Sequence, residues 1–183
     1  MNTHLMIDLE TLGNTADTVV LSMGAVLFTK EKQLATGHWF FNYGMQIKAK
    51  RAIDPSTLHW WLKQGDGLGS LMSQCMAQGK SASAILTEFT GTWLPQFAPG
   101  VVKELRAWSK GANFDVPIVE HMMAACGIQV PWQFWNVRCY RTLHTIWGLQ
   151  EKPNAKKHDA LSDAITQATA VREFLEANPG ADK

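Results

Sequence analysis

Cysteine, net charge and long hydrophobic runs are all scarce in this sequence, and each shortage excludes a class of protein. The cysteines, Cys75, Cys126 and Cys139, lie far apart and form no CxxC pair, which argues against a disulfide framework or a zinc finger. Reduced thiols of this kind are typical of a cytoplasmic protein. No apolar run approaches the ~20 residues that cross a bilayer, and no charged-then-apolar leader is evident at the start. We therefore expect no membrane span and no signal peptide.

The charge balance is close to neutral, with a net charge of +1. No overall field attracts a polyanion, so any nucleic acid must be bound at a local site, with metal ions as one means. Hydrophobic residues make up 46% and charged residues 18% of the 183 residues, which suits a single folded domain over residues 1–183. The eight tryptophans can fill a core or offer stacking surfaces to bases.

The hydrophobic pattern predicts strands alternating with helices. Strands are expected at residues 4–9, 18–28, 39–44, 105–109 and 135–139, and helices at 55–64, 81–97, 114–126, 141–147 and 159–177. A turn is expected at 30–37, a loose link at 65–69 and a polar loop at 150–157. Asp54 and either Ser81 or Ser83 are expected to cap helices, and Gly127 to end one.

The order of these elements predicts the sheet. Short links between the first three strands imply an antiparallel meander. The two later strands follow helical crossovers, so they are expected to run parallel to the first strand. The predicted fold class is α/β, with a mixed five-stranded sheet flanked by helices.

Two acids stand within the first predicted strand, in the run Ile7-Asp8-Leu9-Glu10. Side chains two residues apart on a strand point to the same face, and two steps separate them by about 6.6 Å. Oxygens of Asp8 and Glu10 can therefore converge on one divalent ion. A buried pair that serves only packing is hard to rationalise, because unpaired buried charge is costly.

Two further acids lie near the starts of predicted helices. Asp115 follows the fourth strand and a glycine-containing turn, where sheets of this kind often place catalytic groups. Asp163 lies in the first turn of the last helix, and His158 precedes that helix. Each alone has an ordinary structural interpretation, since an acid at a helix start often serves as a cap or dipole partner. Together with Asp8 and Glu10, they form the set that a two-metal site requires.

The electrostatics of such a set favour bound cations. Two carboxylates about 4 Å apart repel by roughly 4 kcal/mol at an effective dielectric near 20. Oxygen ligands suit Mg²⁺ or Mn²⁺ better than zinc. Two such ions about 3.5–4 Å apart can stabilise the attacking and leaving oxygens of a phosphodiester. A histidine, whose side chain has a pKa near 6.5 in model peptides, can take the proton of an attacking water at neutral pH, and His158 is the candidate.

The motifs resemble those of the DEDD superfamily of 3'-5' exonucleases, in its His-containing branch (DEDDh). The matching stretches are Ile7–Thr11, Asn113–Asp115 and the H-x4-D pattern of 158–163. The longer runs MIDLETLGNTADTVVLSMGAV, TLHWWLKQ and KHDALSDAI resemble compact phage and bacterial exonucleases related to the ribonuclease Rv2179c-like and phage DexA-like proteins. A cytoplasmic protein of a bacterium or a phage-infected host cell is therefore expected.

The resemblance implies a ribonuclease-H-like fold and a role for each motif residue. Asp8, Glu10 and Asp163 would hold a first divalent metal, and Asp8 with Asp115 a second. His158 would be the general base, and the product a nucleoside 5'-monophosphate released from a free 3' end. Thr11 and Leu12 follow the first motif, where relatives hold the terminal nucleotide by backbone contacts and an apolar wedge.

Substrate contacts are less directly indicated. Many relatives have His-Asn-Ala-x-Phe-Asp at the second motif, whereas this chain has Lys110 and Gly111 in the first two places. Trp60, Trp61 and Phe114 are candidates for base stacking, with Trp61 and Phe114 preferred, although one of two adjacent tryptophans on a helix is expected in the core. Candidate phosphate contacts are Lys110, Arg138, Arg141, Lys156 and Lys157.

The sequence thus predicts a metal-dependent 3'-5' exonuclease that acts on single-stranded nucleic acid. Two alternatives stay open: a ribonuclease-H-like endonuclease, and a non-catalytic nucleic-acid-binding module of the same fold. An endonuclease needs a groove for duplex and usually a basic handle, which the sequence does not show. The choice between RNA and DNA depends on contact with a 2'-hydroxyl, and no residue indicates one. A homodimer is equally open.

Overall fold

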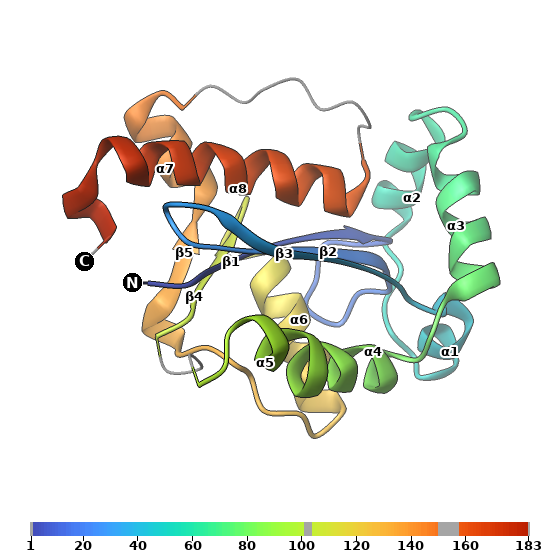
Figure 1. The fold of residues 1–183 in the computed structure, drawn as a ribbon. Coiled ribbons are helices and arrows are strands. Elements are labelled where there is room, and N and C mark those ends of the chain that lie inside the picture. Colours follow the sequence, from blue (N-terminus) through green and yellow to red (C-terminus); the bar gives the residue numbers. More distant parts are fainter. Residues whose placement is uncertain (1, 101–103, 150–157, 183) are drawn as a thin grey trace.

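The computed structural model describes residues 2–100, 104–149 and 158–182. One mixed sheet has helices on both faces (Figure 1). Its strands are β1 (His4–Thr11), β2 (Val20–Phe28), β3 (Gln33–Phe40), β4 (Arg106–Ser109) and β5 (Val137–Cys139), in the order β3-β2-β1-β4-β5. β1 to β3 pair antiparallel, while β4 runs parallel to β1 and to β5. The predicted α/β fold class, a meander extended by parallel strands, is confirmed.

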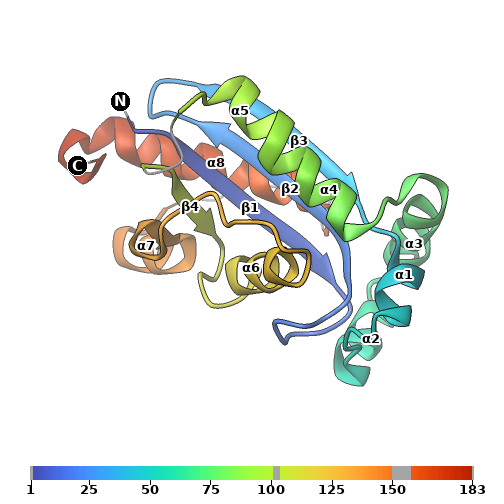
Figure 2. The same ribbon diagram turned by 90° about the horizontal axis from the view of Figure 1, so that it is seen from below.

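Eight α-helices in the described residues surround the sheet. They are α1 (Tyr43–Lys48), α2 (Pro55–Leu62), α3 (Gly67–Gln78), α4 (Ala82–Glu88), α5 (Leu94–Phe97), α6 (Asp115–Ala125), α7 (Tyr140–Trp147) and α8 (Ala160–Ala177). A π-helical turn, Phe89–Trp93, joins α4 to α5, and Figure 2 shows these helices and α6 on the face of the sheet opposite α8. In the part of the chain that is described, no helix is both long and apolar enough to span a membrane.

The alternation of β1 divides its side chains between two cores. Leu5, Ile7 and Leu9 pack into the core beneath α4, α5 and α6, whereas Met6 faces the core under α8. Asp8 and Glu10 continue the Met6 side, because residues two apart on a strand share a face. A Cβ on Gly24 of β2 would lie 2.2 Å from the carbonyl oxygen of Ala160. Glycine at this position therefore lets the start of α8 close down on the sheet beside the two acids.

Several predicted ends of elements are confirmed. Asp54 caps α2 by accepting from the backbone N–H of Ser56 (2.7 Å), with Pro55 as the first helical residue. Ser81, rather than Ser83, caps α4 by accepting from the N–H of Ala84 (3.2 Å). Gly127 follows α6 with a positive φ of 67°, a conformation that glycine adopts without strain.

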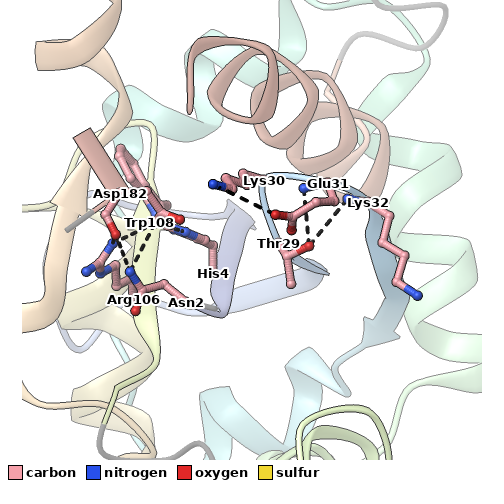
Figure 3. Close-up of polar contacts among 9 residues, drawn as sticks. All are labelled: Asn2, His4, Thr29, Lys30, Glu31, Lys32, Arg106, Trp108 and Asp182. Carbon is pink, nitrogen blue, oxygen red and sulfur yellow. Dashed lines mark hydrogen bonds and ion pairs between the residues drawn. The ribbon is translucent and has the colours of Figure 1, made fainter. Parts of the chain in front are cut away.

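The prediction for β3 was wrong at both of its ends. The strand begins at Gln33, six residues earlier than predicted, and ends at Phe40, four residues earlier than predicted. The turn is confined to 29–32, where the Thr29 hydroxyl accepts from the N–H groups of Glu31 and Lys32 (Figure 3). β3 lies at the edge of the sheet and buries only Trp39 fully, and its sequence lacks the hydrophobic alternation that marks a regular half-buried strand.

Two helices were missed. α1 begins at Tyr43, inside the predicted third strand, and α3 begins at Gly67, inside the predicted loose link. α3 contains two glycines and buries only Leu71 and Cys75. Glycine disfavours helices and a narrow apolar stripe gives little periodic signal, so tertiary packing and not local preference fixes this helix.

A polar network ties the chain's last turn to the start of β1 (Figure 3). Asp182 accepts from Arg106 (2.7 Å) and lies 3.0 Å from Nε2 of His4. The indole N–H of Trp108 donates to Nδ1 of His4 (3.0 Å), so His4 carries its proton on Nε2 and donates it to Asp182. Burial lowers the pKa of His4 to about 4, and the ring is therefore neutral near pH 7.

Candidate active site

Three carboxylates converge where β1 meets the start of α8. Asp8, Glu10 and Asp163 each offer an oxygen, and these oxygens lie within 4.8 Å of one another. β1 places the first two on one face, and the close approach of α8 at Gly24 brings the third above them. The structure therefore brings together residues that are more than 150 positions apart in the sequence.

The two acids at the start of α8 have different roles. Asp159 is the N-cap, and its side chain accepts from the backbone N–H of Ser162 (2.9 Å). Asp163 lies one turn further and points into the cluster with Asp8 and Glu10. The capping bond explains why Asp163, rather than its neighbour one turn away, faces the acids of β1.

Asp115 approaches the same strand from the other side. It is the first residue of α6, it is 3% exposed, and its Oδ1 accepts from the backbone N–H of Leu9 (3.1 Å). The pairing of β1 with β4 ends at Met6 and Trp108. Beyond that pair, the Asp115 carboxylate takes the place of a β4 carbonyl as the acceptor for the N–H of Leu9. Asp115 is outside the group of three converging oxygens, but its charge raises the pKa of Asp8.

Burial makes ionisation of this cluster unfavourable in the absence of cations. Burial is the largest cause of three raised pKa values. The pKa of Asp8 lies well above its usual range, that of Glu10 is about 8 and that of Asp115 is about 7. Neighbouring carboxylates add to the shift of Asp8 and of Glu10. One neutral donor offsets part of it, since Nε2 of Gln167 donates to Oδ1 of Asp8 (2.9 Å). A bound cation would reverse the preference and favour the charged carboxylates.

Gln167 was missed by the sequence reasoning. It lies one turn after Asp163 on the same face of α8 and is 2% exposed. The signal was present as an i,i+4 spacing from a proposed metal ligand, but a glutamine in a helix is ordinarily interpreted as a surface residue.

His158 shares a hollow of about 240 Å³ with the cluster. Asp8, Glu10 and Asp163 line it, together with Lys110 and Gln167. His158 has a positive φ of 61°, and its ring packs edge-on against Trp60 and Trp61, with centroids 4.8 Å and 5.8 Å away. The backbone and the two indoles thus hold the imidazole at the wall of the acidic hollow.

A second hollow of about 340 Å³ adjoins the first, since Leu9 and Glu10 line both. Its other lining residues are Thr11, Gly13, Asn14, Ser56, Thr57, Trp60, Trp61 and Phe114. A hollow lined by both polar groups and aromatic rings suits a nucleoside, which has a polar sugar and a flat base. Thr11, Trp61 and Phe114, predicted as substrate contacts, are therefore brought to one place.

The two tryptophans of α2 are placed differently. Trp61 is 1% exposed and its indole N–H donates to the carbonyl of Thr11 (2.9 Å), whereas Trp60 is 42% exposed. The expectation that one of the pair lies in the core is met by Trp61, which leaves Trp60 with the larger free ring face. Leu12 is 2% exposed and packs with Trp61 in a third core cluster, so it offers little surface for a wedge.

The candidate phosphate contacts separate into three groups. Lys110 lines the acidic hollow, and Arg141, at the start of α7, lies beside Gly111. Arg138 is turned toward the backbone, where one guanidinium nitrogen donates to the carbonyls of Trp135 (2.7 Å) and Val137 (3.2 Å). Lys156 and Lys157, with the predicted loop 150–157, lie outside the described residues.

Comparison with known proteins supports the motifs. A family model described as the 3'-5' exoribonuclease Rv2179c-like domain matches residues 3–175. No curated protein matches the sequence.

The fold is similar to that of DEDD-type exonucleases with known structures. E. coli exonuclease I in its zinc-bound complex with single-stranded DNA has a TM-score of 0.67 and 11% identity, over 98% of this chain and 41% of that one. Its complex with a dT13 oligonucleotide gives 0.68 and 11%, over 99% and 42%. Cell-death related nuclease 4 gives 0.65 and 14%, over 97% and 65%. These likenesses show the ribonuclease-H-like fold, and the chain spans about two fifths of the length of exonuclease I.

Proposed function

The chain belongs to the Rv2179c-like 3'-5' exoribonuclease family, and from this membership we propose that it removes nucleotides one at a time from the 3' end of single-stranded nucleic acid with the help of two divalent cations. The observation that carries the proposal is the convergence of Asp8, Glu10 and Asp163 within 4.8 Å in a hollow that His158 also lines. RNA is the first substrate to test, because the family is described as exoribonucleases.

The residues fit a site for Mg²⁺ or Mn²⁺. Three carboxylate oxygens within 4.8 Å form the hard, anionic ligand set that these ions prefer. Asp8, Glu10 and Asp163 would hold one ion, and Asp8 with Asp115 the other. When bound, the ions supply Lewis-acid stabilisation of the attacking and leaving oxygens.

The side chains of the chain then divide the remaining work. The scissile phosphate occupies the acidic hollow, and the 3'-terminal nucleoside occupies the adjoining hollow between Trp60, Phe114 and Thr11. The imidazole of His158 accepts the proton of the attacking water, a role that histidine side chains commonly take in catalysis. Water attacks phosphorus, the bond to the 3'-oxygen of the next nucleotide breaks, and a nucleoside 5'-monophosphate leaves.

Digestion of end-labelled oligonucleotides tests the proposal. Single-stranded RNA and DNA, each labelled at the 3' or the 5' end, are incubated with the protein and Mg²⁺ or Mn²⁺. We expect immediate release of labelled monophosphate from the 3'-labelled strand and a descending ladder from the 5'-labelled strand. Cleavage of a circular strand would instead indicate an endonuclease. Binding without any monophosphate release would indicate a non-catalytic module.

Three further predictions accompany this proposal. We propose that residues 1–183 act as a single domain, that the protein works in the cytoplasm, and that a homodimer is compatible with its activity. Size-exclusion chromatography with light scattering would give the oligomeric state directly.

A further inference from the structure

The departure from the family pattern at the second motif has a structural counterpart. Lys110 lines the acidic hollow together with Asp8 and Asp163. It directly follows β4, and its backbone carbonyl accepts from the N–H of Arg141 in the first turn of α7 (3.0 Å). The two cationic residues thus belong to one turn-to-helix junction at the rim of the site.

Gly111 lies beside the guanidinium of Arg141. A Cβ at position 111 would lie 3.5 Å from a terminal nitrogen of Arg141 and 3.8 Å from its Cζ, which is ordinary van der Waals contact. Lysine and glycine at 110 and 111, in place of the His-Asn pair of many relatives, therefore put one cation next to a second at this junction.

The charge of Arg141 reaches the site while its side chain stays accessible. It lowers the pKa of Asp115 and so opposes part of the effect of burial, yet Arg141 itself is exposed. Residues 121–150, which include β5 and α7, contain no Asp or Glu. No carboxylate of this segment competes with an incoming phosphate for the guanidinium.

Building on the proposed exonuclease activity, we propose that Lys110 and Arg141 form a subsite for the phosphate immediately 5' of the scissile phosphate. α2, which supplies Trp60 to the terminal-nucleoside hollow, lies on one side of the end of β1, whereas β4, β5 and α7 lie on the other (Figures 1 and 2). A nucleic-acid strand whose 3'-terminal nucleoside occupies that hollow therefore passes the acidic residues and continues toward Lys110 and Arg141. The arginine fork can bind two phosphate oxygens, and the lysine adds a point charge.

The length of the substrate tests this subsite. A dinucleotide contains only the scissile phosphate, whereas a trinucleotide adds one phosphate on its 5' side. The ratio of kcat/KM for the first cut of a trinucleotide to that of a dinucleotide is expected to fall about tenfold in Arg141→Gln or Lys110→Gln, through KM, because a charge-assisted contact is lost. Arg141→Lys, which keeps the charge without the fork, should give an intermediate ratio.

Two controls sharpen the result. Lys32→Gln removes an exposed lysine from the β2–β3 turn (Figure 3), which follows the Phe28–His4 pair at the start of β1, and should leave the ratio unchanged. A trinucleotide with a neutral methylphosphonate at the 5'-side linkage should lower the ratio in the wild type and make it equal in all variants. If the charged trinucleotide and the dinucleotide lose kcat/KM equally in the variants, the subsite is refuted while the exonuclease proposal stands. If the wild type releases no monophosphate from either substrate, both fail.

Discussion

The two ends of β1 treat buried charge in opposite ways. At the start of the strand, the carboxylate of Asp182 is paired with Arg106 and accepts from a neutral His4. At its end, Asp8 and Glu10 face Asp163, and Asp8 accepts from Gln167, a donor without charge. A partner of opposite charge offsets the desolvation cost of a buried carboxylate, while like charges crowded together add to that cost. The difference indicates that the first end is built for stability and the second for binding a cation.

The largest expected effect follows from removing one acid at the crowded end. Asp8→Asn keeps the shape of the side chain and takes away one charge, so we expect monophosphate release to fall by at least about a hundredfold. The metal-free variant should be at least as stable as the wild type, because a buried and repelled carboxylate is gone. Activity assays and urea unfolding with a chelator measure the two effects. If the variant unfolds at much lower urea concentrations than the wild type, the loss of activity reflects a damaged fold, and Asp8 mainly supports the fold.

The next effect concerns the proposed base. His158→Asn should lower kcat by about 10² to 10⁴, the usual contribution of general acid–base catalysis. Asparagine tolerates the positive φ at position 158 better than most residues, so the backbone should be retained. The rate of the wild type should rise as pH increases toward neutrality, because only a deprotonated base can accept the proton of the water. An unchanged pH–rate profile in the variant would rule out the base role.

At the compensated end, the expected effect is on stability and not on catalysis. Asp182→Asn removes the partner of Arg106 and weakens the acceptor of His4, so the free energy of unfolding should fall by about 3 kcal/mol. The kcat should stay close to that of the wild type, because Asp182 lies at the opposite end of β1 from the acidic hollow. Urea unfolding and the oligonucleotide assay on the same preparation decide whether the two ends are separable in this way.

In metal-free protein, the stability contributions of the two ends should depend on pH in opposite directions. Folding raises the pKa of Glu10 to about 8, so this group costs nothing below the unfolded value near 4.5 and destabilises the fold increasingly as pH rises from there to 8. Glu10→Gln should therefore gain stability over the wild type across that window, by no more than about 1.4 kcal/mol per pH unit. Equal unfolding free energies of the two proteins at pH 5 and pH 8 would contradict the burial of this carboxylate.

His4 should act in the reverse direction. Folding lowers its pKa to about 4, so its contribution to stability is fully present above the unfolded value near 6.5 and is lost as pH falls from 6.5 to 4. In Glu10→Gln, where the acidic end contributes less, unfolding free energies measured between pH 4 and pH 6.5 should rise more steeply with pH than in the wild type.

Local patterns predicted much of the fold and most of the acidic site. β1 and β2 are mostly apolar and almost wholly buried, and α8 repeats its buried residues every three to four positions, so these elements give clear signals in the sequence. α3 and the start of β3 could not be predicted, because their residues are mostly exposed and only contacts with distant elements hold them. The position of Asp163 opposite Asp8 depends on Gly24, whose importance appears only when α8 is seen against β2.

The most direct test of the central claim is calorimetric titration of Mn²⁺ into chelator-treated protein, with Asp163→Asn compared to Asp159→Asn. Asparagine caps a helix about as well as aspartate, so both variants keep α8. Each variant loses one negative charge, at positions that are four residues apart. We predict that Asp159→Asn binds Mn²⁺ nearly as the wild type does and that Asp163→Asn binds it at least about tenfold more weakly, as expected for a lost ligand. Equal affinity of the two variants would contradict the convergence of Asp8, Glu10 and Asp163 on a cation.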